Sequence, residues 1–274
     1  MIVLDQENRI FTLHTQNTTY QMKVDQYNVL LHTYYGAKID NFDLSALIQC
    51  GDRSFTPNPS EAGSNRNYSL DVMPQEYSTC GVGDFRLPSI ELELANGSRT
   101  ADMRYEGFRL EKGKYTLEDL PGFYSSEDEA ETLVIILKDA AAQVMMELYY
   151  SVFEAYDLIT RTVRVVNQGT EEIRLCRCAS LCLDFLQSDM DFITFNACHL
   201  MERYMDRGPL RSGIQSVGSV RGISSHQHNP FVILCDRCAD EETGMCYGAM
   251  LLYSGNFEAA VECSKYENSR LIMG

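Results

Sequence analysis

Apolar and polar residues alternate along much of this chain, with the period of two that is typical of β-strands. In the run Val144–Tyr149 every even-numbered position is apolar. The run Ile159–Val166 is rich in β-branched residues and ends at a turn, Asn167–Gly169. Because the segment Glu172–Phe185 follows that turn directly, the two segments are predicted to form an antiparallel pair.

Similar patterns predict many further strands, and polar turns that contain glycine separate them. These strands are expected at Arg9–Leu13, Thr19–Val24, Ser89–Leu94, Leu133–Leu137, Phe231–Cys235, Cys246–Tyr253 and Ala259–Glu262. No segment of helical length repeats with a period of 3.6. The expected strands are too many for one open sheet, which seldom exceeds about ten strands. The prediction is therefore an all-β fold in which two large sheets pack together.

Composition and charge narrow the classes of partner. The 274 residues are 45% hydrophobic and carry a formal net charge of −16, so nucleic acid and anionic membrane surfaces are not expected partners. No stretch reaches the roughly 18 apolar residues of a membrane span. The segment Met1–Arg9 contains Asp5 and Glu7 and does not resemble a signal peptide. A cytoplasmic location is expected, and in a reducing compartment the ten cysteines would be free thiols.

The cysteine and histidine spacings do not match those of a metal or redox site. Cys176, Cys178 and Cys182 have even spacing, which predicts that they share one face of a single strand. The pair Cys235-x-x-Cys238 has no second such pair, whereas a structural zinc site needs four ligands. The motif His226-x-His228 is interpreted as part of a hydrogen-bonded loop. The prediction is that the chain contains no metal site.

Three loop phrases are rich in the polar and aromatic residues that binding loops use. They are Leu70–Ser89 (LDVMPQEYSTCGVGDFRLPS), Ser224–Phe231 (SSHQHNPF) and Tyr253–Phe257 (YSGNF). Together with the opening strands and in this order, they resemble the N-terminal domain of family 36 glycoside hydrolases, the bacterial α-galactosidases. The resemblance extends over nearly the whole chain.

That resemblance implies a β-super-sandwich, similar to galactose mutarotase, as a single domain over residues 1–274. It also implies that the chain stops before the catalytic TIM barrel of the family. The full-length enzyme would hydrolyse terminal α-galactosides of the melibiose or raffinose type with retention and without a cofactor. Its expected partners are galactose-containing oligosaccharides, its own barrel and the neighbouring subunits of a homotetramer. Both catalytic aspartates of the family lie on the barrel, so no catalytic residue is expected in this chain.

The segment Gly51–Asp71 contains prolines and glycines and is predicted to be a long exposed loop. In the family, the matching loop crosses a subunit contact, and an aspartate and an arginine from it reach the sugar pocket of a neighbouring barrel. By resemblance these residues are Asp52 and Arg66. Their chemistry suits a sugar, because a carboxylate accepts hydrogen bonds from vicinal hydroxyls and a guanidinium donates to them.

Other interpretations remain open. Glu76 and Asp84 are candidates for a glycosidase acid pair, but a loop network with Arg86 and Arg104 is the preferred interpretation. A free-standing carbohydrate-binding module is the main alternative function. An epimerase similar to mutarotase is a third, in which Glu76 or Asp184 would meet His226. One departure from the family is His199, which stands where relatives commonly carry a tryptophan; the chain contains no tryptophan.

Overall fold

The computed structural model describes residues 1–48, 51–52 and 58–274, and among them strands are by far the commonest regular element. The all-β prediction is confirmed. The described residues also form three short 3₁₀ helices, η1 (Leu44–Leu47), η2 (Ser60–Ala62) and η3 (Glu154–Tyr156). No helix in the described part of the chain is long and apolar enough to cross a membrane.

The chain divides into two compact units. Unit 1 comprises Met1–Thr116 and Phe123–Leu183, and unit 2 comprises Leu117–Gly122 and Asp184–Gly274. A single domain over residues 1–274 stays a prediction.

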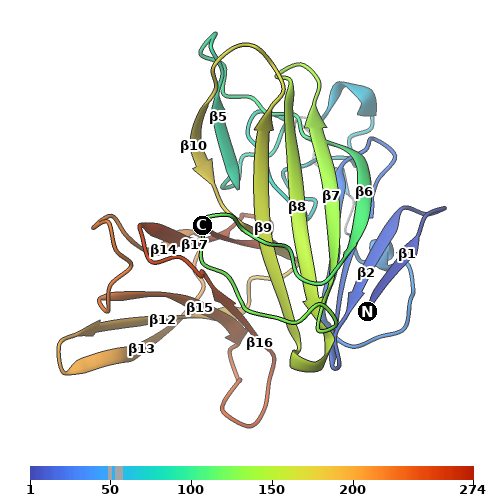
Figure 1. Ribbon diagram of the computed structural model, residues 1–274. Coiled ribbons are helices and arrows are strands. Elements are labelled where there is room, and N and C mark those ends of the chain that lie inside the picture. Colours follow the sequence, from blue (N-terminus) through green and yellow to red (C-terminus); the bar gives the residue numbers. More distant parts are fainter. Residues whose placement is uncertain (49–50, 53–57) are drawn as a thin grey trace. The chain divides into compact units, whose positions relative to one another are not determined.

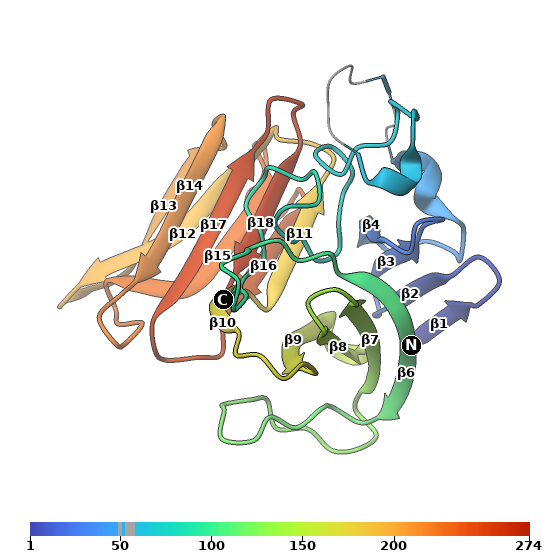
Figure 2. The same ribbon diagram turned by 90° about the horizontal axis from the view of Figure 1, so that it is seen from above.

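Unit 1 is built from antiparallel sheets. One sheet has the order β1-β2-β3-β4 (Figure 2), a second has the order β6-β7-β8-β9, and a two-stranded sheet pairs β10 with β5 (Figure 1). The strands are β1 (Ile2–Asp5), β2 (Ile10–His14), β3 (Thr18–Val24), β4 (Leu30–Ala37), β5 (Ile90–Glu93), β6 (Arg104–Lys112), β7 (Glu131–Asp139), β8 (Val144–Phe153), β9 (Leu158–Asn167) and β10 (Arg174–Cys178).

The alternation in β8 determines which residues enter the core of unit 1. Val144, Met146, Leu148 and Tyr150 are all buried, whereas Met145 and Tyr149 between them are partly exposed. Burial of each such apolar side chain stabilises the fold by about 1.5–3 kcal/mol. The strand predicted from the period of two is therefore confirmed, and its apolar face is the buried one.

The predicted pairing of residues 159–166 with 172–185 is wrong. β9 is an edge strand whose partner is β8, and the second segment divides into β10 and β11 (Leu181–Phe185), which join different sheets. β10 pairs with β5 instead, where Leu175 lies opposite Leu92. Opposite charges also face each other across this pair, with Arg177 Nε 3.7 Å from a carboxylate oxygen of Glu91. Such cross-strand contacts favour the β5 partner over a hairpin with β9.

Unit 2 contains two four-stranded sheets, with the orders β13-β12-β15-β16 and β11-β18-β17-β14; β11 begins in unit 1 and ends in unit 2. The remaining strands are β12 (Met190–Cys198), β13 (Met201–Pro209), β14 (Gly213–Ser219), β15 (His228–Asp236), β16 (Cys246–Met250), β17 (Phe257–Cys263) and β18 (Ser269–Met273). Figure 1 shows the two sheets as layers, with β14 and β17 in one and β12, β13 and β15 in the other.

The central strand β12 uses both of its faces. Ile193 packs against Cys235 and Ala239 in a small apolar core, joined by Phe195. Phe192, Thr194 and Asn196 project from the opposite face.

Candidate functional site

The two residues that the resemblance assigns to sugar binding lie together. Arg66 Nε is 3.1 Å from Asp52 Oδ1, and each side chain is 56% exposed. An ion pair this exposed contributes little to stability, typically about 0–1 kcal/mol. Both side chains can therefore turn to an external ligand at small cost to the fold. Residues 53–57 of the same predicted loop lie outside the described residues.

The backbone around Arg66 is held by local hydrogen bonds and a buried anchor. Asn58 Nδ2 donates to the carbonyl of Asn65 at 2.8 Å, and the Asn67 amide donates to Asn65 Oδ1 at 3.1 Å. Two residues after Arg66, the buried Tyr68 ring packs edge-on against Tyr27, with ring centroids 4.8 Å apart. The segment that carries Arg66 is thus anchored to unit 1, although the Arg66 side chain is exposed.

Unlike the exposed residues Asp52 and Arg66, Glu76 is at the centre of a buried network. Its carboxylate accepts hydrogen bonds from the hydroxyls of Tyr20 at 2.7 Å and Tyr150 at 2.8 Å. It also lies 3.1 Å from His32 Nδ1 and 2.9 Å from Arg161. The Arg161 guanidinium lies over the Tyr150 ring, 4.9 Å from its centroid.

The electrostatics of the network favour an ionised Glu76. Burial alone would raise the pKa of this carboxyl group, but the Arg161 charge and the hydrogen bonds from His32 and Tyr20 outweigh burial and lower it. Burial raises the pKa of Tyr20 and of Tyr150 well above the usual range, so both remain hydrogen-bond donors. Because Glu76 is enclosed on all sides with 0% exposure, this network is structural.

The loop network predicted for Asp84 is confirmed in part. Arg86 Nε donates to Asp84 Oδ1 at 2.9 Å, and the same guanidinium donates to the carbonyls of Leu70 and Met73. Arg104 belongs elsewhere and pairs with Asp102. The single network of Glu76, Asp84, Arg86 and Arg104 expected from the sequence is therefore wrong, because Glu76 has its own partners.

In unit 2, Asp184 forms a buried ion pair. Arg270 on β18 donates from Nε and from a terminal nitrogen to the two carboxylate oxygens of Asp184 on β11, at 2.6 and 2.7 Å. Arg270 is 0% exposed. Of the two carboxylates considered for an epimerase, Glu76 is bound to the tyrosine network of unit 1 and Asp184 to Arg270. His226 is exposed.

The cysteines do not form the predicted face. Cys176 and Cys178 lie on β10, whereas the buried Cys182 lies on β11, because the segment breaks between them.

No cluster of three or more His, Cys, Asp or Glu residues that could hold a metal ion occurs in residues 1–48, 51–52 and 58–274. The Nδ1 atom of His228 lies 3.1 Å from Asn196 Oδ1. His199, at the family tryptophan position, is exposed.

Sequence comparison identifies the family. Residues 28–274 match the model of the glycosyl hydrolase family 36 N-terminal domain. The chain is 44% identical over 273 residues to the bifunctional alpha-galactosidase/sucrose kinase AgaSK of Mediterraneibacter gnavus, covering 100% of this chain and 29% of that protein. It is 38% identical to alpha-galactosidase AgaA of Geobacillus stearothermophilus, covering 100% of this chain and 37% of that protein. The chain thus spans about a third of the length of these relatives.

Solved structures agree with this assignment. The galactosidase domain of AgaSK superposes with a TM-score of 0.97 at 43% identity, over 100% of this chain and 38% of that one. A variant of AgaA in complex with raffinose superposes with a TM-score of 0.93 at 39% identity, over 97% of this chain and 37% of that one. The chain belongs to glycosyl hydrolase family 36 and corresponds to the N-terminal domain of its alpha-galactosidases.

Proposed function

We propose that this chain is the N-terminal domain of a retaining α-galactosidase and that it supplies Asp52 and Arg66 to a galactose-binding pocket. The observation that carries the proposal is the exposed Asp52–Arg66 ion pair, at the two positions that the resemblance assigns to sugar contact. The family match adds support. So do the relatives, since AgaA variants have been crystallised with raffinose and with stachyose.

In this proposal the chemistry itself occurs on a barrel outside these residues. The domain would contribute to the assembly of a cytoplasmic homotetramer, in which the Asp52–Arg66 pair reaches the barrel of a neighbouring subunit. The Asp52 carboxylate accepts from two hydroxyls of the galactosyl group, and Arg66 donates to the same group. No metal or organic cofactor takes part. Reading the gene beyond codon 274 tests the proposal directly, because a barrel-length extension is expected.

The 274-residue chain by itself is expected to be inactive on a chromogenic α-galactoside. The reason is that no pair of carboxylates in it is assigned to the reaction, and Glu76 and Asp184 are bound internally. The measurement is release of the chromophore by the purified chain, with the full-length enzyme as positive control. Turnover that persists through a second purification and a change of expression host would contradict the proposal.

In the full-length enzyme, Asp52→Ala and Arg66→Ala should each lower kcat/KM for raffinose by about ten- to a hundred-fold. A lost hydrogen bond between a charged group and the sugar costs about 1.5–3 kcal/mol, and the loss appears in kcat/KM if the contact persists in the transition state. Since both side chains are exposed, the free energy of unfolding should change by less than about 0.5 kcal/mol.

A matched control is the exposed pair of Lys112 and Asp128, whose atoms lie 2.7 Å apart elsewhere in unit 1. Lys112→Ala and Asp128→Ala should leave kcat/KM unchanged. Dissociating the oligomer should reproduce much of the Asp52→Ala defect, because the contact is made between subunits. Wild-type kcat/KM for both Asp52→Ala and Arg66→Ala in correctly assembled enzyme would remove the pair from the site.

A further inference from the structure

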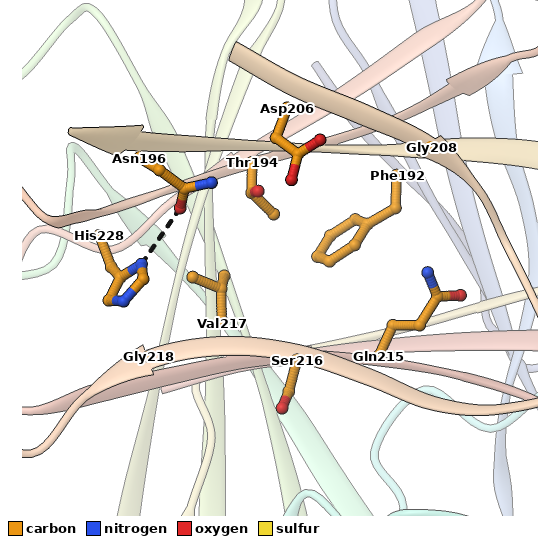
Figure 3. Close-up of a pocket in the computed structure, with 10 residues that line it drawn as sticks. All are labelled: Phe192, Thr194, Asn196, Asp206, Gly208, Gln215, Ser216, Val217, Gly218 and His228. Atoms are coloured by element: carbon orange, nitrogen blue, oxygen red, sulfur yellow. Dashed lines mark hydrogen bonds between the residues drawn. The ribbon is translucent and has the colours of Figure 1, made fainter. Parts of the chain in front are cut away.

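Unit 2 contains a groove of about 430 Å³ between strands β12 and β13 of one sheet and β14 of the other. This volume lies within the range of about 300–1,000 Å³ that small-molecule sites occupy. The groove is not purely apolar, because most side chains around it carry hydrogen-bonding groups (Figure 3). They include Thr194, Asn196, Asp206, Gln215 and His228.

Strand register explains why these groups converge. Thr194 lies opposite Asp206 in the β12–β13 ladder, and Asn196 lies opposite His228 in the β12–β15 ladder. Side chains of directly paired residues project from the same face of a sheet, so all four point toward the groove. Figure 3 shows Gln215 and Val217 approaching from β14, on the other side of the space, while Ser216 between them points away.

Several of these polar groups have unused hydrogen-bonding capacity. In the described part of the chain, the Asp206 carboxylate and the Thr194 hydroxyl have no hydrogen-bond or ion-pair partner. Asn196 uses its Oδ1 atom with His228 Nδ1 at 3.1 Å, and its NH₂ group has no partner in the same residues. The groove thus presents acceptors, a donor and a hydroxyl that does both, all directed at one space.

The charges around the groove decide the class of ligand. Among the described residues, no lysine or arginine lines the groove, and the Asp206 carboxylate would repel an anion, so a phosphate or carboxylate ligand does not fit. Apolar surface is contributed by side chains that include the Phe192 ring and Val217. A neutral ligand with several hydroxyls and an apolar face matches this arrangement. We propose that the groove binds a neutral saccharide unit, at a site separate from the Asp52–Arg66 pair.

Gly208 provides a direct way to test the site. It lines the groove opposite Phe192 in the β12–β13 ladder, and a Cβ atom added there would meet no atom within 4 Å. Its φ angle is not positive, so a larger residue is compatible with the backbone. Gly208→Leu should therefore fill the groove without disturbing the fold. Gly107 in β6 of unit 1 also has open space around its Cβ position, so Gly107→Leu is the matched control.

The experiment is calorimetric titration of the 274-residue chain with galactose and with glucose. We expect saturable binding of at least one of them, with a Kd in the millimolar range. Asp206→Ala should weaken binding about tenfold, because a hydrogen bond to a charged group is lost. Gly208→Leu should abolish binding at an unchanged Tm, whereas the control Gly107→Leu should bind like the wild type.

Three outcomes would overturn the inference. The first is the absence of saturable binding of either sugar. The second is binding that survives Gly208→Leu, or that is lost equally in Gly107→Leu, since either result would separate the binding from the groove. The third is equal or tighter binding of galactose 6-phosphate, which would contradict the assignment of a neutral ligand. The Asp52–Arg66 proposal is unaffected by any failure at the groove, because its own test measures kcat/KM in the full-length enzyme.

Discussion

Replacing Glu76 with glutamine should lower the free energy of unfolding by about 3–5 kcal/mol, because it leaves the buried Arg161 charge without its counter-ion. The substitution keeps the size of the side chain, so lost packing does not contribute. The new NH₂ group would also face the hydroxyls of Tyr20 and Tyr150, which now donate to the carboxylate at 2.7 and 2.8 Å. Two donors facing each other in a buried site leave at least one unsatisfied.

The measurement is urea denaturation followed by circular dichroism, with the free energy extrapolated to zero denaturant. The control is Glu93→Gln, which removes an ion pair with Arg99 at the surface; there the atoms are 2.6 Å apart and the Arg99 side chain is 61% exposed. That substitution should cost no more than about 1 kcal/mol. A loss of similar size in both variants would show that the buried network contributes no more than a surface pair.

The same carboxylate makes stability depend on pH in a defined direction. The pKa of Glu76 is lowered in the folded state, so folding is favoured while the group is ionised. Its contribution is fully present above the pKa of an unfolded glutamate, about 4.3, and is lost as the pH falls through the lower pKa of the folded state. Glu76→Gln should remove this part of the acid dependence. The difference in unfolding free energy between wild type and variant should therefore shrink as the pH is lowered below about 4.

Local patterns were sufficient to predict the strands but not their partners. The alternation in β8 and the β-branched run in β9 identify both strands, because the period of apolar side chains along a strand can be read from the local sequence alone. The partner of β10 is set by residues far away in the sequence, such as Leu92, which lies opposite Leu175. For the same reason the prediction that Cys176, Cys178 and Cys182 share one face is wrong: β10 ends at Cys178, and Cys182 lies on β11 in another sheet.

The candidate sites differ in how far the sequence reveals them. Asp52 and Arg66 were predicted through the family resemblance, and the structure places them 3.1 Å apart. Glu76 was assigned to a loop, although its partners Tyr20, Tyr150 and Arg161 come from three different strands. The sequence indicates the groove of unit 2 only weakly, through the polar phrase Ser224–Phe231, which contains His228. Its other members lie on β12, β13 and β14, and only the register of those strands brings them together.

Arg270→Met should destabilise unit 2 by about 3–5 kcal/mol, because it leaves the Asp184 carboxylate buried without its partner. The position looks unremarkable in the sequence, as one arginine in a strand of apolar residues. In the fold it is 0% exposed, and its planar guanidinium donates to both oxygens of Asp184, at 2.6 and 2.7 Å. A two-point contact of this geometry cannot be replaced by lysine, so Arg270→Lys should also lose much of the stability.

The double variant Arg270→Met, Asp184→Leu separates the cost of a broken pair from the value of the pair itself. With both charges gone, no buried ion is left unpaired, and most of the stability lost in Arg270→Met should return. Chemical denaturation of the wild type, the two single variants and the double variant gives the coupling free energy between the residues. If the double variant is as unstable as the sum of the two single variants, the two residues do not act as a pair. The stability of unit 2 would then depend on other contacts of each side chain rather than on the ion pair between β11 and β18.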